Sequence, residues 1–170
     1  DVNYDIIGEI LDTARQAPSS GNIQNWKFII VKDKEKIEKI AESCLKQHWI
    51  NKAPALIVVC YDQTDIKSLY PEEYEKFSLQ NTAIVSTLIM LKATELGLGS
   101  CWVDVSDKES ISSILKLPLS IIPVVVITLG YSLEYFQKTK RHPVNYLISF
   151  ETYGNKRRKT TTFPLSGKKN

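Results

Sequence analysis

Periodic and continuous apolar segments follow one another along the chain. Segments in which apolar residues recur every three or four positions predict helices, and short unbroken apolar runs predict buried strands. The predicted helices span residues 4–16, 34–45, 75–96 and 107–115. The predicted strands span residues 26–32, 55–61, 100–105 and 121–130. The polar stretch 62–73 shows no period and is expected to be a loop, and the chain after residue 130 is expected to be mostly irregular, apart from a segment at 146–150.

The helix over 75–96 is the longest and the most apolar of these elements. Six residues are expected to form the stripe that faces the core: Leu79, Ala83, Ile84, Leu88, Leu91 and Leu96. Ile89 and Met90 widen this stripe, and a helix that is apolar nearly all round is a central one. Gly97 and Gly99 end it. Because helices and strands are mixed without strict βαβ units, we expect an α+β fold with helices on both sides of a central sheet.

Composition limits the class of protein. The 170 residues are 43% hydrophobic and 24% charged, which is typical of one globular domain. No apolar run reaches the roughly 20 residues of a membrane span, and the first residues show no secretory pattern, so a cytoplasmic location is expected. Cys44, Cys60 and Cys101 are too widely spaced for a disulfide framework or a zinc site. Cys60 and Cys101 have apolar surroundings and are expected to be buried.

Familiar catalytic motifs do not occur in the sequence. It contains no GxSxG, no GxGxxG after a strand, no Walker loop and no HExxH. His48 and His142 are too few and too scattered for a Ser-His-Asp arrangement or a metal site. A protein with so few candidate acids, bases and nucleophiles either binds a ligand or takes its chemistry from a cofactor. The basic cluster at 156–159 is typical of a solvated or partner-wrapping tail rather than of a nucleic-acid-binding module, because no aromatic stacking motif accompanies it.

One polar loop connects the first predicted helix to the first predicted strand. It lies within RQAPSSGNIQNWKFIIV, residues 15–31. The loop displays four polar side chains, Ser19, Ser20, Asn22 and Gln24. Their donors and acceptors could read the edge of a heteroaromatic ring. A helix stop followed by a turn would explain Pro18 and Gly21 equally well, so both interpretations stay open on physical grounds alone.

The same loop resembles the signature of the nitroreductase family, A-P-S-S-x-N-x-Q-x-W-x-F-I-V-V. The matching residues, in order and spacing, are Ala17, Pro18, Ser19, Ser20, Asn22, Gln24, Trp26, Phe28, Ile29 and Val31. In that family the loop contacts a flavin ring, so the resemblance implies FMN as the cofactor. The FMN-binding residues that it implies in this loop are Pro18, Ser19, Ser20, Asn22 and Gln24.

A second segment is similar to the family at a distant position. Residues 93–104, ATELGLGSCWVD, resemble the family's A-x-x-L-G-L-G-S-C-W-I, which ends beside flavin N5. The cofactor-binding residues that this match implies are Trp102, Val103, Asp104 and Val105. Backbone N–H groups there would stabilise charge that develops on the ring. Many relatives have glycine after this tryptophan and isoleucine, where this chain has Asp104 and Val105.

A basic element follows a third match, LP at 117–118 and PVVVITLGY at 123–131. Relatives place a K/R-x-x-P element after it to hold the FMN phosphate, and residues 138–143 are KTKRHP in this chain. Lys140 and Arg141 are therefore the expected phosphate contacts, since a guanidinium can bind phosphate through two hydrogen bonds. An ordinary exposed basic pair is the alternative. The basic R-R-S-x-R element that usually opens the family's sequences has no counterpart before Tyr4.

The resemblance implies an architecture and an activity. The family fold is an α+β homodimer with a mostly antiparallel sheet and two FMN sites at the subunit interface, to which helix 75–96 and the tail would contribute. Residues 1–154 would form the FMN-binding domain and residues 155–170 a basic tail. NADH or NADPH would reduce FMN, which would then reduce a small organic acceptor, such as a nitroaromatic or a quinone. This ping-pong sequence needs no catalytic side chain.

Three alternatives stay open. Relatives with the same fold dehalogenate iodotyrosine or fragment flavin toward a vitamin B12 ligand. A second alternative is a flavin-binding protein without turnover, which the missing N-terminal basic element would suit. A third is a nucleic-acid-binding module that uses the basic tail.

Overall fold

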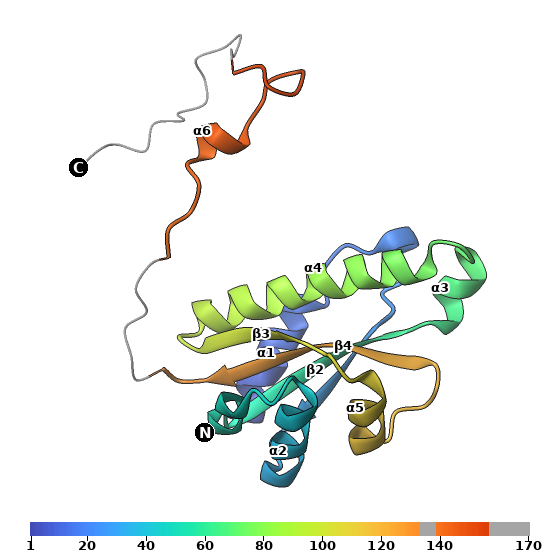
Figure 1. Cartoon of the computed structure of the whole chain (residues 1–170), viewed down its shortest axis with the longest axis vertical. Coiled ribbons are helices and arrows are strands. Elements are labelled where there is room, and N and C mark those ends of the chain that lie inside the picture. Colours follow the sequence, from blue (N-terminus) through green and yellow to red (C-terminus); the bar gives the residue numbers. More distant parts are fainter. Residues whose placement is uncertain (133–138, 157–170) are drawn as a thin grey trace. The chain divides into compact units, whose positions relative to one another are not determined.

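The computed structural model describes residues 1–132 and 139–156 (Figure 1). Its internal contacts divide the chain into two units, Asp1–Leu133 and Glu134–Asn170. The first unit holds the sheet and most of the helices, and the second holds one short helix, α6 (Val144–Leu147). The boundary at residue 154 that was expected between a flavin domain and a basic tail stays a prediction. Most of that tail, residues 157–170, lies outside the described residues, as does Lys138 of the basic element.

The first unit is built on a four-stranded antiparallel sheet in the described part of the chain. The strands are β1 (Trp26–Val31), β2 (Ala55–Asp62), β3 (Gly99–Asp104) and β4 (Ile121–Gly130). Their order is β1-β2-β4-β3, so β1 and β3 form the two edges. Every neighbouring pair is antiparallel, which confirms the expected sheet. A bulge interrupts the pairing of β2 with β4 at Val59/Cys60.

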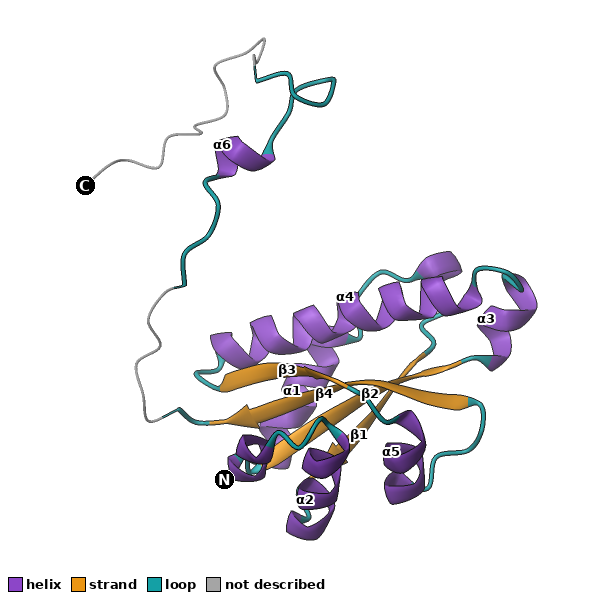
Figure 2. Ribbon diagram, in the orientation of Figure 1, coloured by secondary structure: helices purple, strands orange, loops and turns teal. Residues whose placement is uncertain are grey.

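Helices cover both faces of the sheet, as Figure 2 shows. The α1 (Tyr4–Ala14) and α4 (Tyr74–Glu95) helices lie on one face, and α2 (Lys34–Ser43) and α5 (Lys108–Leu115) lie on the other. Side chains alternate along the fully buried strand β2. Ala55, Ile57 and Val59 pack toward α1 and α4. Leu56, Val58 and Cys60 pack toward α2 and α5. The α+β architecture predicted from the sequence is confirmed.

The stretch 62–73 contains a helix that the sequence analysis missed. It was expected to be a loop, but α3 spans Thr64–Leu69. The Asp62 carboxylate starts it by accepting from the backbone N–H of Thr64 at 3.0 Å and from the Thr64 hydroxyl at 2.7 Å. Ile66 is the fully buried residue of this helix. A helix of this length with one buried side chain is too short to show a hydrophobic period.

The face of α4 that packs on the core is not the one predicted. Its buried residues are Ser78, Asn81, Thr82, Val85, Ser86, Ile89 and Ala93. Three of the expected core residues are exposed: Leu79 by 40%, Ile84 by 39% and Leu91 by 61%. The prediction was wrong because apolar and polar residues occur on every side of this helix, so the spacing of the apolar ones does not select one face. Small side chains on the inner face let the helix lie close to the sheet.

The burial expected for the cysteines is only half confirmed. Cys60 is buried in the middle strand β2, but Cys101 is exposed. Cys101 lies on β3, which is an edge strand with only β4 beside it. Side chains of an edge strand have neighbours from one adjoining strand instead of two, so apolar surroundings in the sequence do not ensure burial there.

Candidate functional site

The loop between α1 and β1 has an unusual backbone. Ser20–Asn22 form a short 3₁₀ turn, and φ is positive at Gly21 (57°), Asn22 (56°) and Gln24 (52°). Glycine adopts this left-handed conformation freely and asparagine tolerates it, but for other residues it is strained. Several such residues in so short a segment require contacts that hold the chain in place.

Hydrogen bonds within the loop bring several of the predicted site residues together. The Ser19 hydroxyl accepts from the backbone N–H of Gln24 at 3.0 Å. The Gln24 side-chain amide donates to the backbone carbonyl of Asn22 at 3.0 Å and to its Oδ1 at 3.2 Å. Ser19 and Ser20 are half-buried, whereas Pro18, Asn22 and Gln24 are exposed. The loop therefore presents fixed amide groups at the surface of the first unit.

A chain of buried amides fastens this loop to α4. Asn81 Oδ1 accepts from the Ser20 backbone N–H at 3.0 Å and from the Ser20 hydroxyl at 3.3 Å. Asn81 Nδ2 donates to Asn25 Oδ1 at 2.9 Å. Asn25 Nδ2 donates in turn to Ser78 Oγ at 3.0 Å and to the Asp62 carbonyl at 3.2 Å. Asn25, Ser78 and Asn81 were not predicted from the sequence. The available signal was the spacing of Ser78, Asn81 and Thr82, which places three polar residues on one side of the helix.

The connection between α3 and α4 closes over the same loop. A Cβ atom placed on Gly21 would lie 2.8 Å from the Tyr70 hydroxyl oxygen. The Tyr70 ring packs edge-to-face against Phe77 of α4, with ring centroids 5.0 Å apart. Glycine suits position 21, because it adopts this φ without strain and because a larger residue there would have to displace the Tyr70 side chain.

The second predicted segment lies at the end of β3. The Trp102 indole N–H donates to Asp104 Oδ1 at 2.6 Å, and both side chains are on the same side of the strand. Val103 is buried and points to the opposite face, toward α2 and α5. The Val105 N–H donates to the Val124 carbonyl at 3.2 Å, so it is already engaged in pairing with β4.

The two segments lie toward the same end of the sheet but on opposite edges. Trp26, which follows the loop, pairs with Tyr61 near the end of β2, and Asp104 pairs with Val125 of β4. Strands β2 and β4 separate the two edges. Three strand spacings amount to roughly 14 Å. The structure thus does not bring the Ser19–Gln24 loop and the end of β3 into direct contact within one chain.

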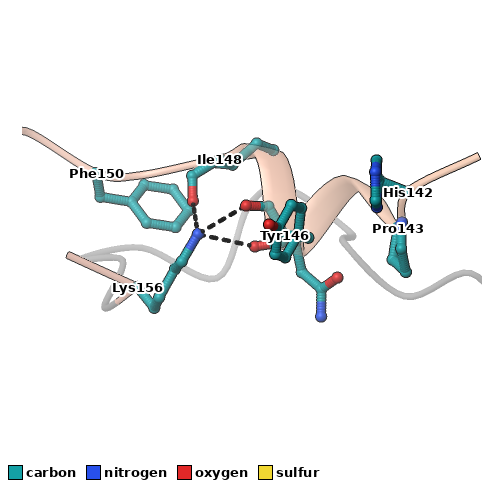
Figure 3. A pocket seen from close by; sticks show the side chains of 7 residues that line it. His142, Pro143, Tyr146, Ile148, Phe150 and Lys156 are labelled. Carbon is teal, nitrogen blue, oxygen red and sulfur yellow. Dashed lines mark hydrogen bonds between the residues drawn. The ribbon is translucent and has the colours of Figure 1, made fainter. Parts of the chain in front are cut away.

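Lys140 and Arg141 belong to the second unit, and both are exposed. Arg141 Nη1 donates to the Thr139 hydroxyl and, at 3.3 Å, to the Lys140 carbonyl. The segment that follows is locally ordered around a hollow, shown in Figure 3. Lys156 Nζ donates there to the carbonyls of Asn145 (3.2 Å), Tyr146 (3.0 Å) and Ile148 (2.7 Å). These carbonyls lie at the end of α6, where a cation is favourable.

Several titratable groups of the first unit have raised pKa values. Burial raises the pKa of the Cys44 thiol to about 11 and that of the Cys60 thiol to about 12, so both stay neutral at ordinary pH. Burial, followed by the charge of Glu75, raises the pKa of Tyr61 to about 12. His48 pairs with Glu42 at 3.3 Å, beyond the end of α2. Within residues 1–132 and 139–156, no group of three or more His, Cys, Asp and Glu side chains could hold a metal ion. No helix in these ranges is long and apolar enough to cross a bilayer.

Comparison with known proteins extends the resemblance to most of the chain. The model of the "Nitroreductase family" matches residues 2–64 and 43–131. A protein of Methanothermobacter thermautotrophicus, named as a candidate NADH dehydrogenase/NAD(P)H nitroreductase, is 36% identical over 138 residues, which cover 79% of this chain and 69% of that protein. The "FMN reductase [NAD(P)H]" of Bacillus subtilis is 26% identical over 164 residues and covers 88% and 66%.

Solved structures agree with the sequence comparison. An FMN-dependent nitroreductase from Clostridium difficile superimposes with a TM-score of 0.76 at 28% identity, and the match covers 90% of both chains. B. megaterium NfrA1 superimposes with a TM-score of 0.80 at 26% identity and covers 89% of this chain and 67% of that one. The expected fold is therefore confirmed, and the chain belongs to the nitroreductase family.

Proposed function

We propose that this chain is an FMN-dependent oxidoreductase that uses NADH or NADPH to reduce a small organic acceptor, such as a nitroaromatic or a quinone. Relatives named as NAD(P)H nitroreductases and as an FMN reductase support the reaction class. The structural observation that carries the proposal is the strained Ser19–Gln24 loop, whose side-chain amides are held by hydrogen bonds within the loop and whose backbone is fastened through Ser20 to the buried Asn81. Such fixed donors and acceptors are of little use to the fold itself and suit a ligand.

The residues of the loop fit the ring of FMN. The ring edge carries both carbonyl acceptors and an N–H donor, and Asn22 and Gln24 offer amide groups of both kinds. Pro18 and Ser19 flank these amides in the same loop. We assign the ring contact to this loop, a second contact to residues 102–105, and the phosphate contact to Lys140 and Arg141.

FMN, when bound, would supply the transfer of an electron pair between NAD(P)H and the acceptor. The residues of this chain would bind and orient the ring, and none is assigned the role of an acid or a base. This assignment agrees with the neutral thiols of Cys44 and Cys60 and with the pairing of His48 to Glu42. Donor and acceptor would use the same exposed ring face in turn, which is a ping-pong sequence.

A second copy of the chain would complete the site. Ile84 and Leu91 lie seven positions apart on the outer side of α4 and are exposed, and the half-buried Leu88 between them also packs against the core. An exposed apolar stripe of this kind is typical of an interface between protein chains. In a symmetric dimer the loop of one protomer and the end of β3 in its partner can reach the same ring, although they lie on opposite edges of one sheet.

Spectroscopy and kinetics of the purified protein test this function. We expect a yellow dimer that binds added FMN, oxidises NADH or NADPH, and gives parallel lines in double-reciprocal plots with a quinone as acceptor. A protein that binds no flavin after FMN is added would overturn the proposal. Flavin binding without NAD(P)H oxidation would also contradict it and would favour a carrier or a flavin-fragmenting relative. Release of iodide from iodotyrosine would identify a dehalogenase.

Arg141→Ala tests the phosphate assignment. We expect FMN to bind about 10- to 150-fold more weakly, which corresponds to the roughly 1.5–3 kcal/mol of a hydrogen bond to a charged group. Riboflavin, which lacks the phosphate, should bind the variant and the wild type equally. Titration of the apoprotein with each ligand measures both effects, and Lys36→Ala, at an exposed position of α2, is the control. Equal losses for the two ligands would place Arg141 away from the phosphate.

A further inference from the structure

The buried amides behind the candidate flavin loop form one connected system. Asn81 is 1% exposed, Asn25 is 5% exposed and Ser78 is fully buried. They join the loop, the start of β1, the end of β2 and α4, which are up to 61 positions apart in the sequence. The two asparagines are joined directly, because Asn81 Nδ2 donates to Asn25 Oδ1. Polar groups buried to this extent are retained in a core only when their partners are in place.

We propose that Asn81 is a positioning residue for the flavin, acting through Ser20 and the loop rather than by touching the cofactor. This inference rests on the proposed function. Asn81 Oδ1 takes both hydrogen bonds that Ser20 offers, one from its backbone N–H and one from its hydroxyl. Ser20 is the first residue of the 3₁₀ turn. The left-handed residues Gly21 and Asn22 follow directly, so the anchor is at the start of the strained segment.

The inner partner, Asn25, fixes the orientation of the Asn81 side chain. Asn25 Nδ2 donates to Ser78 Oγ and to the Asp62 carbonyl, which leaves Asn25 Oδ1 to accept from Asn81 Nδ2. The Asn81 amide must therefore turn its oxygen toward Ser20. The backbone of Asn25 is held as well, because its carbonyl accepts from the Asp62 N–H at 2.7 Å. The sheet and α4 thus determine jointly where the loop stands.

Removal of Asn81 would leave a folded protein with a loosened loop. The sheet and the apolar contacts of α4 would remain, but the Ser20 N–H would lose its acceptor and the segment 21–24 could relax toward unstrained φ values. The contacts between the loop and the flavin ring would then be lost together. The loop reads the ring and not the phosphate, so FMN and riboflavin would be affected alike. This is the opposite of the pattern expected for Arg141→Ala.

Asn81→Leu and Asn81→Asp test the acceptor and the donor of the Asn81 side chain separately. Leucine removes both the acceptor for Ser20 and the donor to Asn25 while keeping the same branching and number of side-chain heavy atoms. Aspartate keeps an acceptor for Ser20 but loses the donor to Asn25, so it should restore part of the function. Gln80→Leu is the matched control, because Gln80 is the adjacent amide side chain and is exposed on the same helix.

The experiment compares these variants with the wild type by titration of the apoprotein with FMN and with riboflavin, and by the flavin midpoint potential. We expect Asn81→Leu to weaken both ligands about 10- to 100-fold, Asn81→Asp to weaken both by about two- to tenfold, and Gln80→Leu to change neither. We also expect the midpoint potential of the bound flavin to shift in both Asn81 variants. A tenfold difference between the losses of the oxidised and reduced ligand would shift the two-electron potential by about 30 mV. Circular dichroism of each apoprotein verifies folding.

The outcomes separate this inference from the proposed function. A wild type that binds no flavin overturns both. A wild type that binds FMN, with a folded Asn81→Leu variant whose affinities and potential are unchanged, overturns the positioning role alone. A loss for FMN with none for riboflavin does the same. If Asn81→Leu does not fold, Asn81→Asp decides, because the two-ligand loss and the potential shift are expected in it as well, and unchanged values would overturn the role.

Discussion

The two faces of the sheet are covered by helices of different character. Under α2 and α5 the core cluster is formed by apolar residues and cysteines, and Thr128 of β4 is a buried polar residue on the same side of the sheet. Both helices begin with an aspartate whose carboxylate accepts a backbone N–H, Asp33 from Lys36 at 3.0 Å and Asp107 from Ser110 at 2.9 Å. On the other face, α4 buries serine, threonine and asparagine and exposes isoleucine and leucine. The residue that precedes α4, Glu73, makes no capping side-chain hydrogen bond to the helix.

We infer that the α2 and α5 face serves mainly the stability of the fold, and that the α4 face serves mainly its function. The α2 and α5 helices follow the ordinary pattern, with apolar residues inside and polar ones outside. The inner side of α4 holds the candidate flavin loop through Asn81, and its outer side exposes the apolar residues that we propose as a contact with a second copy. Changes on the two faces should therefore have effects of different kinds.

Leu91→Lys should have the largest effect, and the effect should be on association. Leu91 is 61% exposed in the single chain and lies on the outer side of α4. Burial of a leucine contributes about 1.5–3 kcal/mol, and a symmetric interface contains it twice, so dimerisation should weaken by about 3–6 kcal/mol. Sedimentation equilibrium measures the change. Leu119→Lys is the control, because Leu119 is 94% exposed and lies outside α4. A dimer that survives Leu91→Lys unchanged would exclude this surface as the interface.

Ile40→Ala should act on the other face and on folding alone. Ile40 is fully buried between α2 and the sheet. An Ile→Ala change in a core lowers the free energy of unfolding by about 2–5 kcal/mol, through lost burial and the cavity left behind. Urea unfolding measures this loss, with the exposed Glu38→Ala on the same helix as the control. FMN affinity of the folded variant should not change, and a parallel fall in affinity would show that the two faces are coupled.

The contrast between the faces also explains how far the sequence could predict the fold. The spaced isoleucines of α2 fit a helical period, and the apolar run of β2 was assigned to a strand by its short length and its β-branched residues. In α4 apolar residues occur on every side, so their spacing could not show that Ser78 and Ser86 face the core and that Leu91 is exposed. Which side of α4 faces the core depends on the elements that pack against the helix, and the sequence of the helix alone does not specify them.

The candidate site was likewise predicted only in part. The resemblance selected Ser19, Asn22 and Gln24, and the structure brings these three together by hydrogen bonds. The anchor behind them was not predicted, because Asn25 and Asn81 are 56 positions apart and belong to no common local pattern. Long-range polar pairs of this kind become visible only when the sheet places β1 beneath α4.

Alkaline pH should lower the free energy of unfolding through the buried thiol of Cys60, which lies on the α2 and α5 side of the sheet. Burial raises the pKa of Cys60 from about 9 to about 12, so the folded state retains a proton that the unfolded state releases. This contribution to stability is complete below pH 9 and is lost as the pH rises toward 12, by up to about 1.4 kcal/mol per pH unit. Cys60→Val, which cannot ionise, should unfold in urea with a shallower dependence on pH above 9. Equal slopes for the variant and the wild type would contradict this assignment, and Cys101→Ser, at the exposed thiol, should change the slope less.

The smallest expected effects come from two serines on the inner side of α4, and they should have opposite signs. Ser78 and Ser86 are both fully buried. Ser78 Oγ accepts from Asn25 at 3.0 Å, whereas Ser86 Oγ has no hydrogen-bond partner among the described residues. Ser78→Ala should lower the free energy of unfolding by about 1 kcal/mol, because an amide N–H of Asn25 loses its acceptor. Ser86→Ala should raise it by about 1 kcal/mol, because a desolvated hydroxyl is removed and alanine favours the helix. Urea unfolding of the two variants decides the matter. A loss of stability in both would mean that Ser86 is satisfied in solution, and that the polar side of α4 works as a whole and not through the Asn25 and Asn81 pair alone.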